Sequence, residues 1–263
     1  MSTESSAITR ICHELPHALA PTTPQVVTDR LRGLIHRGEL GPGDRLPPER
    51  ALADELGIAR VSLREALAQL QQEGYLTARR GALGGTFVTE LVEPKRRWLR
   101  RMRDNLGDLE DIIDYRIAVE GHAARLAAAR RDIPDLRAMD DSMRQLSDVT
   151  GVVAFRAADN AFHHAIAAAA RSPRVQAAIN EARGLLFMPT DALVYPPDVG
   201  HSLRDHRRIA AAIRENNGEE ATRAMREHIE STRDWLRQVL TEPDPSSVGE
   251  PTPRPRPTAN PRG

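Results

Sequence analysis

The chain has 263 residues, of which 40% are hydrophobic and 28% charged, with a formal net charge of zero and a single cysteine, Cys12. This length leaves room for two domains of about 100–150 residues each, and one cysteine excludes a disulfide framework within the chain. No apolar run approaches the roughly 20 residues that span a bilayer and no signal-peptide pattern begins the chain, so we expect a cytoplasmic protein with no membrane partner.

Charge is unevenly distributed along the chain. Residues 21–103 carry 15 lysines and arginines against 10 acidic residues, whereas residues 104–241 carry 18 against 22. A basic first half joined to an acidic second half suits a DNA reader attached to a domain that does not touch DNA. Aromatic residues are scarce, at 3%, which together with many alanines and leucines favours helices packed on helices.

The N-terminal third predicts a loose arm followed by three helices. Residues 1–20 show no sustained periodicity, and apolar spacing then predicts a helix over residues 25–37. Residues 46–74 predict two further short helices with a break at Gly57, and the second of them ends at Gly74.

The last of these helices, from about residue 60 to residue 73, has two different faces. Leucine and alanine form one face, and the opposite face carries Val61, Arg64 and Ala68, with Arg60 at its start. Such a helix can enter a major groove, although ordinary two-helix corners with solvated arginines show the same pattern. Residues 75–88 favour the first interpretation, because they predict a β-hairpin with a basic, glycine-rich turn, a wing that directly follows the helix.

Residues 24–88 resemble the winged helix-turn-helix of GntR-family repressors, in the phrases GPGDRLPPERALADELGIAR, SLREAL and GGTFV. We therefore expect a DNA-binding domain over residues 21–89. The resemblance implies that Arg50, Arg60 and Arg64 touch DNA and that Gly81 lies at the wing tip, which reaches the minor groove. Val61 replaces the polar residue often found beside the first recognition arginine, which leaves the base specificity open.

A charged connector, residues 90–107, separates the wing from a helical second half. Its basic cluster between Lys95 and Arg103 could lie along phosphates, but a solvated linker helix is the commoner role of such a run. Six helical stretches without strand-like alternation follow, approximately at 108–130, 134–147, 152–171, 173–187, 199–216 and 219–240. The predicted fold class is mainly α: a winged helix-turn-helix of three helices and a hairpin, joined to an all-α bundle of six to seven helices over residues 108–240. Proline-rich residues 241–263 are expected to be disordered.

Ionisable residues on the predicted inner faces of the bundle point to a metal site. Asp159 and His163 lie beside the apolar stripe of one helix, and His206 and His228 lie within the stripes of two others. One such histidine is most often a hydrogen-bonded core residue, but three with a carboxylate suggest a shared site. An unpaired buried carboxylate costs several kcal/mol, which a divalent cation offsets. Neutral imidazoles and a carboxylate suit Zn, Ni or Mn, with other positions open to water or ligand.

Most of residues 108–240 resembles the FCD ligand-binding domain of FadR-like GntR regulators, in the phrases DNAFHHAI, DHRRIAAAI and AMREHI. The resemblance implies that the metal ligands are Asp159, His163, His206 and His228. Ser172-Pro173 stands where many relatives have Ser-Asn, which concerns local ligand contacts and not the metal ligands.

Arg116 and Glu120 form a second inward pair, on the first bundle helix. As i, i+4 neighbours they can neutralise each other, or Arg116 can offer its guanidinium to the carboxylate of a ligand beside the metal. The resemblance favours the second role, because the matching arginine lines the effector cavity of FCD regulators. Arg183, at the edge of the apolar face of its own helix, is a weaker candidate.

These features predict a metabolite-responsive transcriptional regulator, taken to be a repressor, that binds a double-stranded DNA operator as a homodimer and responds to a small carboxylate metabolite. Two alternatives stay open: a regulator for which the metal itself is the signal, and a metal-dependent enzyme. We predict that the chain is not an enzyme, because no separate general base or nucleophile stands at a convincing spacing and the winged module would have no role.

Overall fold

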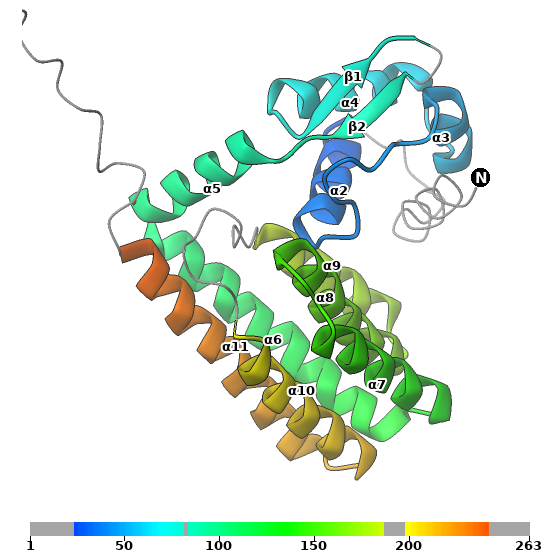
Figure 1. Cartoon of the computed structure of the whole chain (residues 1–263). Helices are drawn as coiled ribbons and strands as arrows, with labels where there is room; N and C mark the ends of the chain where they lie inside the picture. Colours follow the sequence, from blue (N-terminus) through cyan, green and yellow to red (C-terminus); the bar gives the residue numbers. More distant parts are fainter. Residues whose placement is uncertain (1–23, 82–83, 187–197, 242–263) are drawn as a thin grey trace, which may run out of the picture.

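The structure is a computed structural model that describes residues 24–81, 84–186 and 198–241. Within these ranges the chain forms ten helices and one two-stranded hairpin, arranged as an N-terminal head (residues 24–88) and a C-terminal bundle (residues 106–241) that one helix connects, as Figure 1 shows. This arrangement confirms the predicted fold class. The arm expected over residues 1–20, and all but the first residue of the tail expected over residues 241–263, lie outside the described residues.

The head is a winged helix-turn-helix. It comprises α2 (Pro24–His36), α3 (Glu49–Leu56), α4 (Arg60–Gln72), β1 (Leu76–Arg79) and β2 (Gly85–Val88), with the two strands antiparallel. Gly57 ends α3 at a φ of 64°, a left-handed conformation that glycine adopts without steric cost, and so makes the tight turn into α4. The predicted apolar face of α4 is buried and packs against α2 and α3, which leaves the opposite face exposed.

Helix α5 (Val92–Asp104) connects the head to the bundle. It is helical, as expected for the linker, but it is not solvated all round. Lys95, Trp98 and Leu99 are buried because the helix packs against two helices of the bundle, whereas four of its five arginines are exposed.

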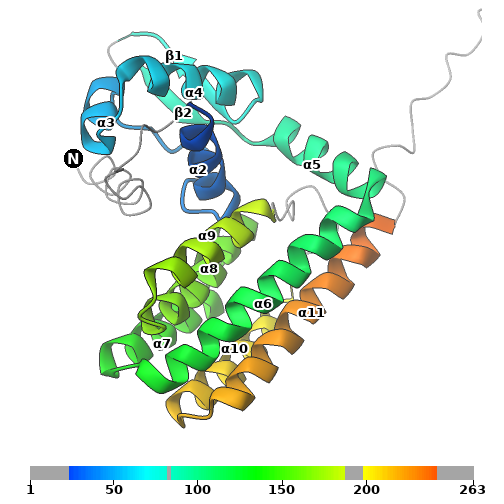
Figure 2. The same cartoon turned by 180° about the vertical axis from the view of Figure 1, so that it is seen from behind.

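The bundle consists, in the described residues, of α6 (Leu106–Arg130), α7 (Ile133–Ser147), α8 (Val152–Ala169), α9 (Pro173–Leu185), α10 (Val199–Arg214) and α11 (Gly218–Thr241). The bounds of these helices lie within two residues of the six predicted stretches. Figures 1 and 2 show α6 and α11 running side by side along the bundle, and α6 also contacts α8, α9 and α10. Helix α6 is therefore the central helix against which the others pack.

The head and the bundle are joined through their cores. Helix α2 packs against α9, and most of the buried apolar residues of both units belong to one continuous cluster, apart from a small second cluster within the bundle. At this crossing the two backbones approach closely, because a Cβ placed on Gly184 would lie only 3.2 Å from the Cα of Gly33. No helix among the described residues is long and apolar enough to cross a membrane.

Candidate metal and effector site

Asp159, His163, His206 and His228 converge in the interior of the bundle from α8, α10 and α11. Each offers one ligand atom, and these atoms all lie within 4.8 Å of one another. The three histidines are buried, and the side chain of Asp159 is 15% exposed. The structure thus brings together all four residues of the predicted metal set.

The donor atoms of this cluster face one another. His206 Nε2 lies 3.3 Å from Asp159 Oδ1, and His163 Nε2 lies 4.0 Å from the same oxygen. Within the described residues, none of the ring nitrogens of His163 and His206 makes a hydrogen bond, although all four are buried. Buried polar atoms normally have partners. These ring nitrogens are therefore suited to bind a cation that several donor atoms share.

A divalent cation fits this donor set. Burial lowers the pKa of His163 to about 3 and also lowers the pKa of His206, so both imidazoles are neutral and can act as ligands. Burial alone would raise the pKa of Asp159, but Arg183 and His206 hold that pKa well below its usual value, so the group is a carboxylate. Around an ion held by four tetrahedral ligands at about 2.0–2.2 Å, donor atoms lie about 3.3–3.6 Å apart, so donors that now lie up to 4.8 Å apart would approach by somewhat more than about 1 Å.

Two carboxylates outside the cluster orient its histidines. His228 Nδ1 donates a hydrogen bond to Asp205 Oδ2 at 3.1 Å, which leaves Nε2 as the donor for the cluster. Glu120 Oε2 lies 2.5 Å from His163 Nδ1, in contact but without the alignment of a hydrogen bond. Carboxylates beside histidines in this way fix the tautomer and the orientation of metal-binding rings. Sequence reasoning assigned this role to neither carboxylate.

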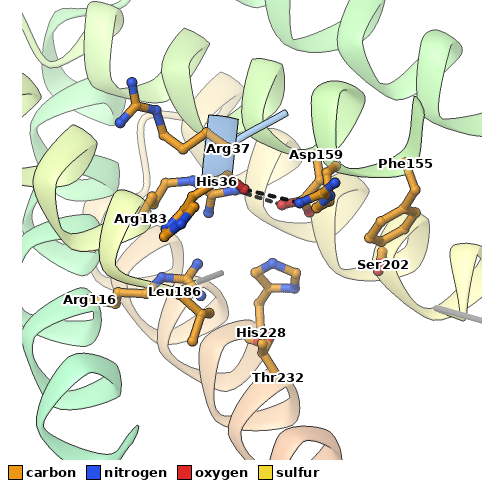
Figure 3. Close-up of a pocket in the computed structure, with 11 residues that line it drawn as sticks. His36, Arg37, Arg116, Phe155, Asp159, Arg183, Leu186, Ser202, His228 and Thr232 are labelled. Carbon is orange, nitrogen blue, oxygen red and sulfur yellow. Dashed lines mark hydrogen bonds and ion pairs between the residues drawn. The ribbon is translucent and has the colours of Figure 1, made fainter. Parts of the chain in front are cut away.

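A small cavity of about 60 Å³ lies beside the cluster, and Figure 3 shows the side chains around it. Residues of both units line it, among them Asp159, His228, Arg116 and Arg183 of the bundle and His36 and Arg37 at the end of α2. Arg116 donates from Nε to Glu120 Oε1 at 2.6 Å, and its terminal nitrogens make no hydrogen bond within the described residues. Both roles weighed for Arg116 are therefore compatible, because it neutralises Glu120 while its remaining donors can bind a carboxylate in the cavity.

Arg183 has a more central position than its sequence pattern indicated. Its side chain is 8% exposed, Nη2 donates to Asp159 Oδ2 at 2.7 Å, and Nη1 lies 3.5 Å from Glu120 Oε2. Burial alone would raise the pKa of Glu120, but Arg116, His163 and Arg183 hold that pKa well below its usual value. Arg183 therefore fixes the carboxylate of the cluster and shares the neutralisation of Glu120 with Arg116.

The predicted DNA-contacting residues lie on the surface of the head. Arg50 on α3, Arg60 and Arg64 on α4, and Gly81 in the hairpin turn are all exposed. Gly81 has a φ of 104°, a conformation that favours glycine. Figure 1 shows α4 and the hairpin at the end of the molecule away from the bundle, so this surface can meet a partner without hindrance from α6–α11.

Both units are similar to domains of known protein families. Residues 23–88 match the family described as bacterial regulatory proteins, gntR family, and residues 111–231 match the FCD domain. The chain is 32% identical over 212 residues to RmpR of Mycobacterium gastri, named as an HTH-type transcriptional regulator, across 77% of this chain and 76% of that protein. It is 31% identical over 223 residues to a protein of Escherichia coli strain K12 named as a regulatory protein of the L-lactate dehydrogenase operon, across 77% and 82% of the two chains. Among solved structures, E. coli McbR/YncC shares the fold with a TM-score of 0.52 at 20% identity, over 82% of this chain and 97% of that one.

Proposed function

This chain belongs to the gntR family of bacterial regulatory proteins, carries an FCD domain and is a transcriptional regulator rather than an enzyme, and we propose that its signal is a small organic acid. The acid binds in the cavity beside a metal ion held by the bundle and thereby changes the affinity of the head for a DNA operator. The observation that carries this proposal is the cavity itself, which is lined by Asp159 and His228 of the four convergent donors, by Arg116 and by residues at the end of α2.

Each residue of the site has a distinct part in binding the acid. A divalent cation, for which Zn, Ni and Mn suit these donors, supplies positive charge and open coordination positions for a carboxylate. Asp159, His163, His206 and His228 hold the ion, and Arg116 offers its two terminal nitrogens to the carboxylate. Small 2-hydroxy acids are the first class to test, because the E. coli relative is named for an L-lactate dehydrogenase operon.

A chain of hydrogen bonds connects the cavity to the head. Arg183 Nε donates to Asn160 Oδ1 at 3.0 Å, and Asn160 Nδ2 donates to Glu39 Oε1 at 2.9 Å. Glu39, just beyond α2, also accepts from Arg37 Nε at 2.7 Å. A ligand that moves Arg183 therefore changes the contacts that hold the end of α2, and with it the head.

His36 makes a second connection between the two units. Its Nδ1 lies 2.7 Å from the carbonyl oxygen of Gly184, and its Nε2 lies 2.8 Å from the hydroxyl of Tyr75. Because a carbonyl only accepts, Nδ1 carries the proton and Nε2 accepts from Tyr75. Burial lowers the pKa of His36 to about 3, so the ring is neutral, as this arrangement requires. Tyr75 directly precedes β1, so the position of α9 influences that of the wing.

On DNA, the proposed regulator is a homodimer on a palindromic double-stranded operator in the cytoplasm. Each copy presents Arg50, Arg60, Arg64 and Gly81 to one half-site. Repression is the proposed sign of regulation, with release of the operator when the acid binds.

The test uses His206→Ala and His228→Ala in the full chain, with His122→Ala as a matched control because His122 is an exposed histidine on α6. We expect both cluster variants to lose bound metal, measured by mass spectrometry, and to lose the effect of small acids on binding to a DNA duplex selected by the wild-type protein. His122→Ala keeps both properties. A response to acid that persists without metal contradicts the proposed site, and release that follows free metal at constant acid identifies the metal as the signal.

A further inference from the structure

We infer that Val61 reads a thymine in the operator, by placing its methyl groups against the C5-methyl group of that base in the major groove; this inference rests on the proposed binding of the exposed face of α4 to DNA. The inference begins from the exposure of this side chain. Val61 is 65% exposed on the second residue of α4, although that helix packs through its opposite, leucine-rich face. A β-branched residue there adds little to the core and lowers helix propensity slightly, and its exposed methyl groups are available for a contact outside the chain.

The surface around Val61 is complementary to the major groove of DNA in charge and in apolar character. On a helical wheel Val61, Arg64 and Ala68 lie within about 60° of one another, and all three are exposed. Arg60 precedes them, and the hairpin adds the exposed Arg79. A narrow apolar strip bordered by guanidinium groups is complementary to a groove whose edges are phosphates and whose floor carries methyl groups.

The small neighbours of Val61 allow it to approach the floor of the groove. Ala59, the N-cap residue of α4, and Ala68, two turns along, are both exposed and have a single methyl side chain. Neither side chain extends beyond that of Val61, so the valine can touch a base while Arg64 reaches around it to a base edge or a phosphate.

Only thymine offers the right surface to a valine. In the major groove cytosine presents an amino donor, guanine presents acceptors and adenine presents both, whereas thymine also presents a methyl group. Valine against any of the other bases would cover polar atoms without bonding to them, which carries a penalty. Contact with a methyl group and exclusion of the other bases therefore favour the same base.

The test compares duplexes that differ by one methyl group. A duplex is first selected from a random pool by the full-length wild-type protein, and each thymine is then replaced in turn by deoxyuracil, which lacks only the C5-methyl group. Affinities are measured by fluorescence anisotropy at one salt concentration, because phosphate contacts make them depend on salt. We expect at least one thymine at which loss of the methyl group weakens wild-type binding by about fourfold, the value of one buried methyl contact.

Val61→Ala is expected to bind the selected duplex and to be insensitive to the same replacement, whereas Val61→Thr, which keeps one methyl group, retains part of the sensitivity. Val92→Ala, which shortens a valine that is 51% exposed on α5, serves as the control and keeps the wild-type pattern. Each result is a ratio of two affinities of one variant, so it does not depend on the folded fraction. Wild-type binding that ignores every methyl group, or a Val61→Ala variant with undiminished sensitivity, overturns the inference.

Discussion

Asp205 touches the cluster through a single oxygen, and that contact allows a prediction for one residue. Asp205→Asn keeps an acceptor for His228 Nδ1 but removes the negative charge that makes the imidazole a stronger ligand. We expect metal affinity to fall by about 10- to 100-fold, with the fold unchanged. The metal affinity is measured by competition against a chromogenic chelator. Asp140→Asn is the control, because Asp140 pairs with Arg214 on the surface, at 2.9 Å, and carries the same charge. Equal losses in the two variants, or none in either, would count against a role for Asp205 in metal binding.

Individual residues also show how much of the candidate site can be predicted from the sequence. Helical spacing alone places His206 and His228 on inner faces, because 3.6 residues per turn determine which side chains share a face. It cannot determine which inward residues meet, since this depends on how separate helices are rotated and stacked. Asp205 and His228 lie on different helices with no spacing that links them, and so the sequence did not reveal their hydrogen bond. The position of Arg183 between two carboxylates was missed for the same reason.

Among the elements, the connection between α2 and α9 can be tested with Tyr75→Phe. Tyr75 bonds to His36 at the end of α2, and His36 in turn bonds to Gly184 on α9. The substitution removes the hydroxyl that donates to His36 Nε2, so this buried hydrogen bond is lost. We expect the free energy of unfolding, measured by denaturant titration, to fall by about 1–3 kcal/mol. The effect of the acid on operator affinity should also weaken, because the wing is no longer tied to α9.

Tyr115→Phe provides the comparison for this prediction. Tyr115 lies on α6, and its hydroxyl donates to Glu181 at 3.3 Å on the surface, where water can replace a lost bond. Its loss should therefore leave both stability and the acid response close to wild type. If the two tyrosine variants behave alike, the link through His36 does not transmit the signal.

The elements themselves differ in how predictable they were. The helix-turn-helix, the wing and the six bundle helices follow from local signals, such as the break at Gly57 and the apolar periodicity of each segment. The buried face of α5 was obscured by its arginines, because Trp98 and Leu99 are too few to outweigh a charge run in a short window. The crossing of α2 over α9 was not predictable, since Gly33 and Gly184 lie far apart in sequence and only the folded chain brings their backbones together.

For the whole molecule, the shared core determines how binding in the bundle affects the head. Buried residues from Leu31 in α2 to Leu240 in α11 form one cluster, so the two units do not have separate interiors. A transition that loosens the bundle therefore exposes apolar surface that also stabilises the head. Because of this continuity, the stability of the head should report on changes at the proposed metal site, although the two lie apart.

Removal of the metal tests this continuity. A ligand at 100 times its dissociation constant stabilises the folded state by about 2.7 kcal/mol, which for a protein of this size corresponds to a shift of about 5–10 °C in the unfolding temperature. We expect excess chelator to lower the unfolding temperature of the full chain by this amount in calorimetry, and to speed amide exchange in the α4 segment that carries the buried Leu63. His206→Ala should melt at one temperature with or without chelator. Faster exchange confined to α6–α11 would mean that the head is stable on its own, and the acid would then have to act on it through the contacts of α2 alone.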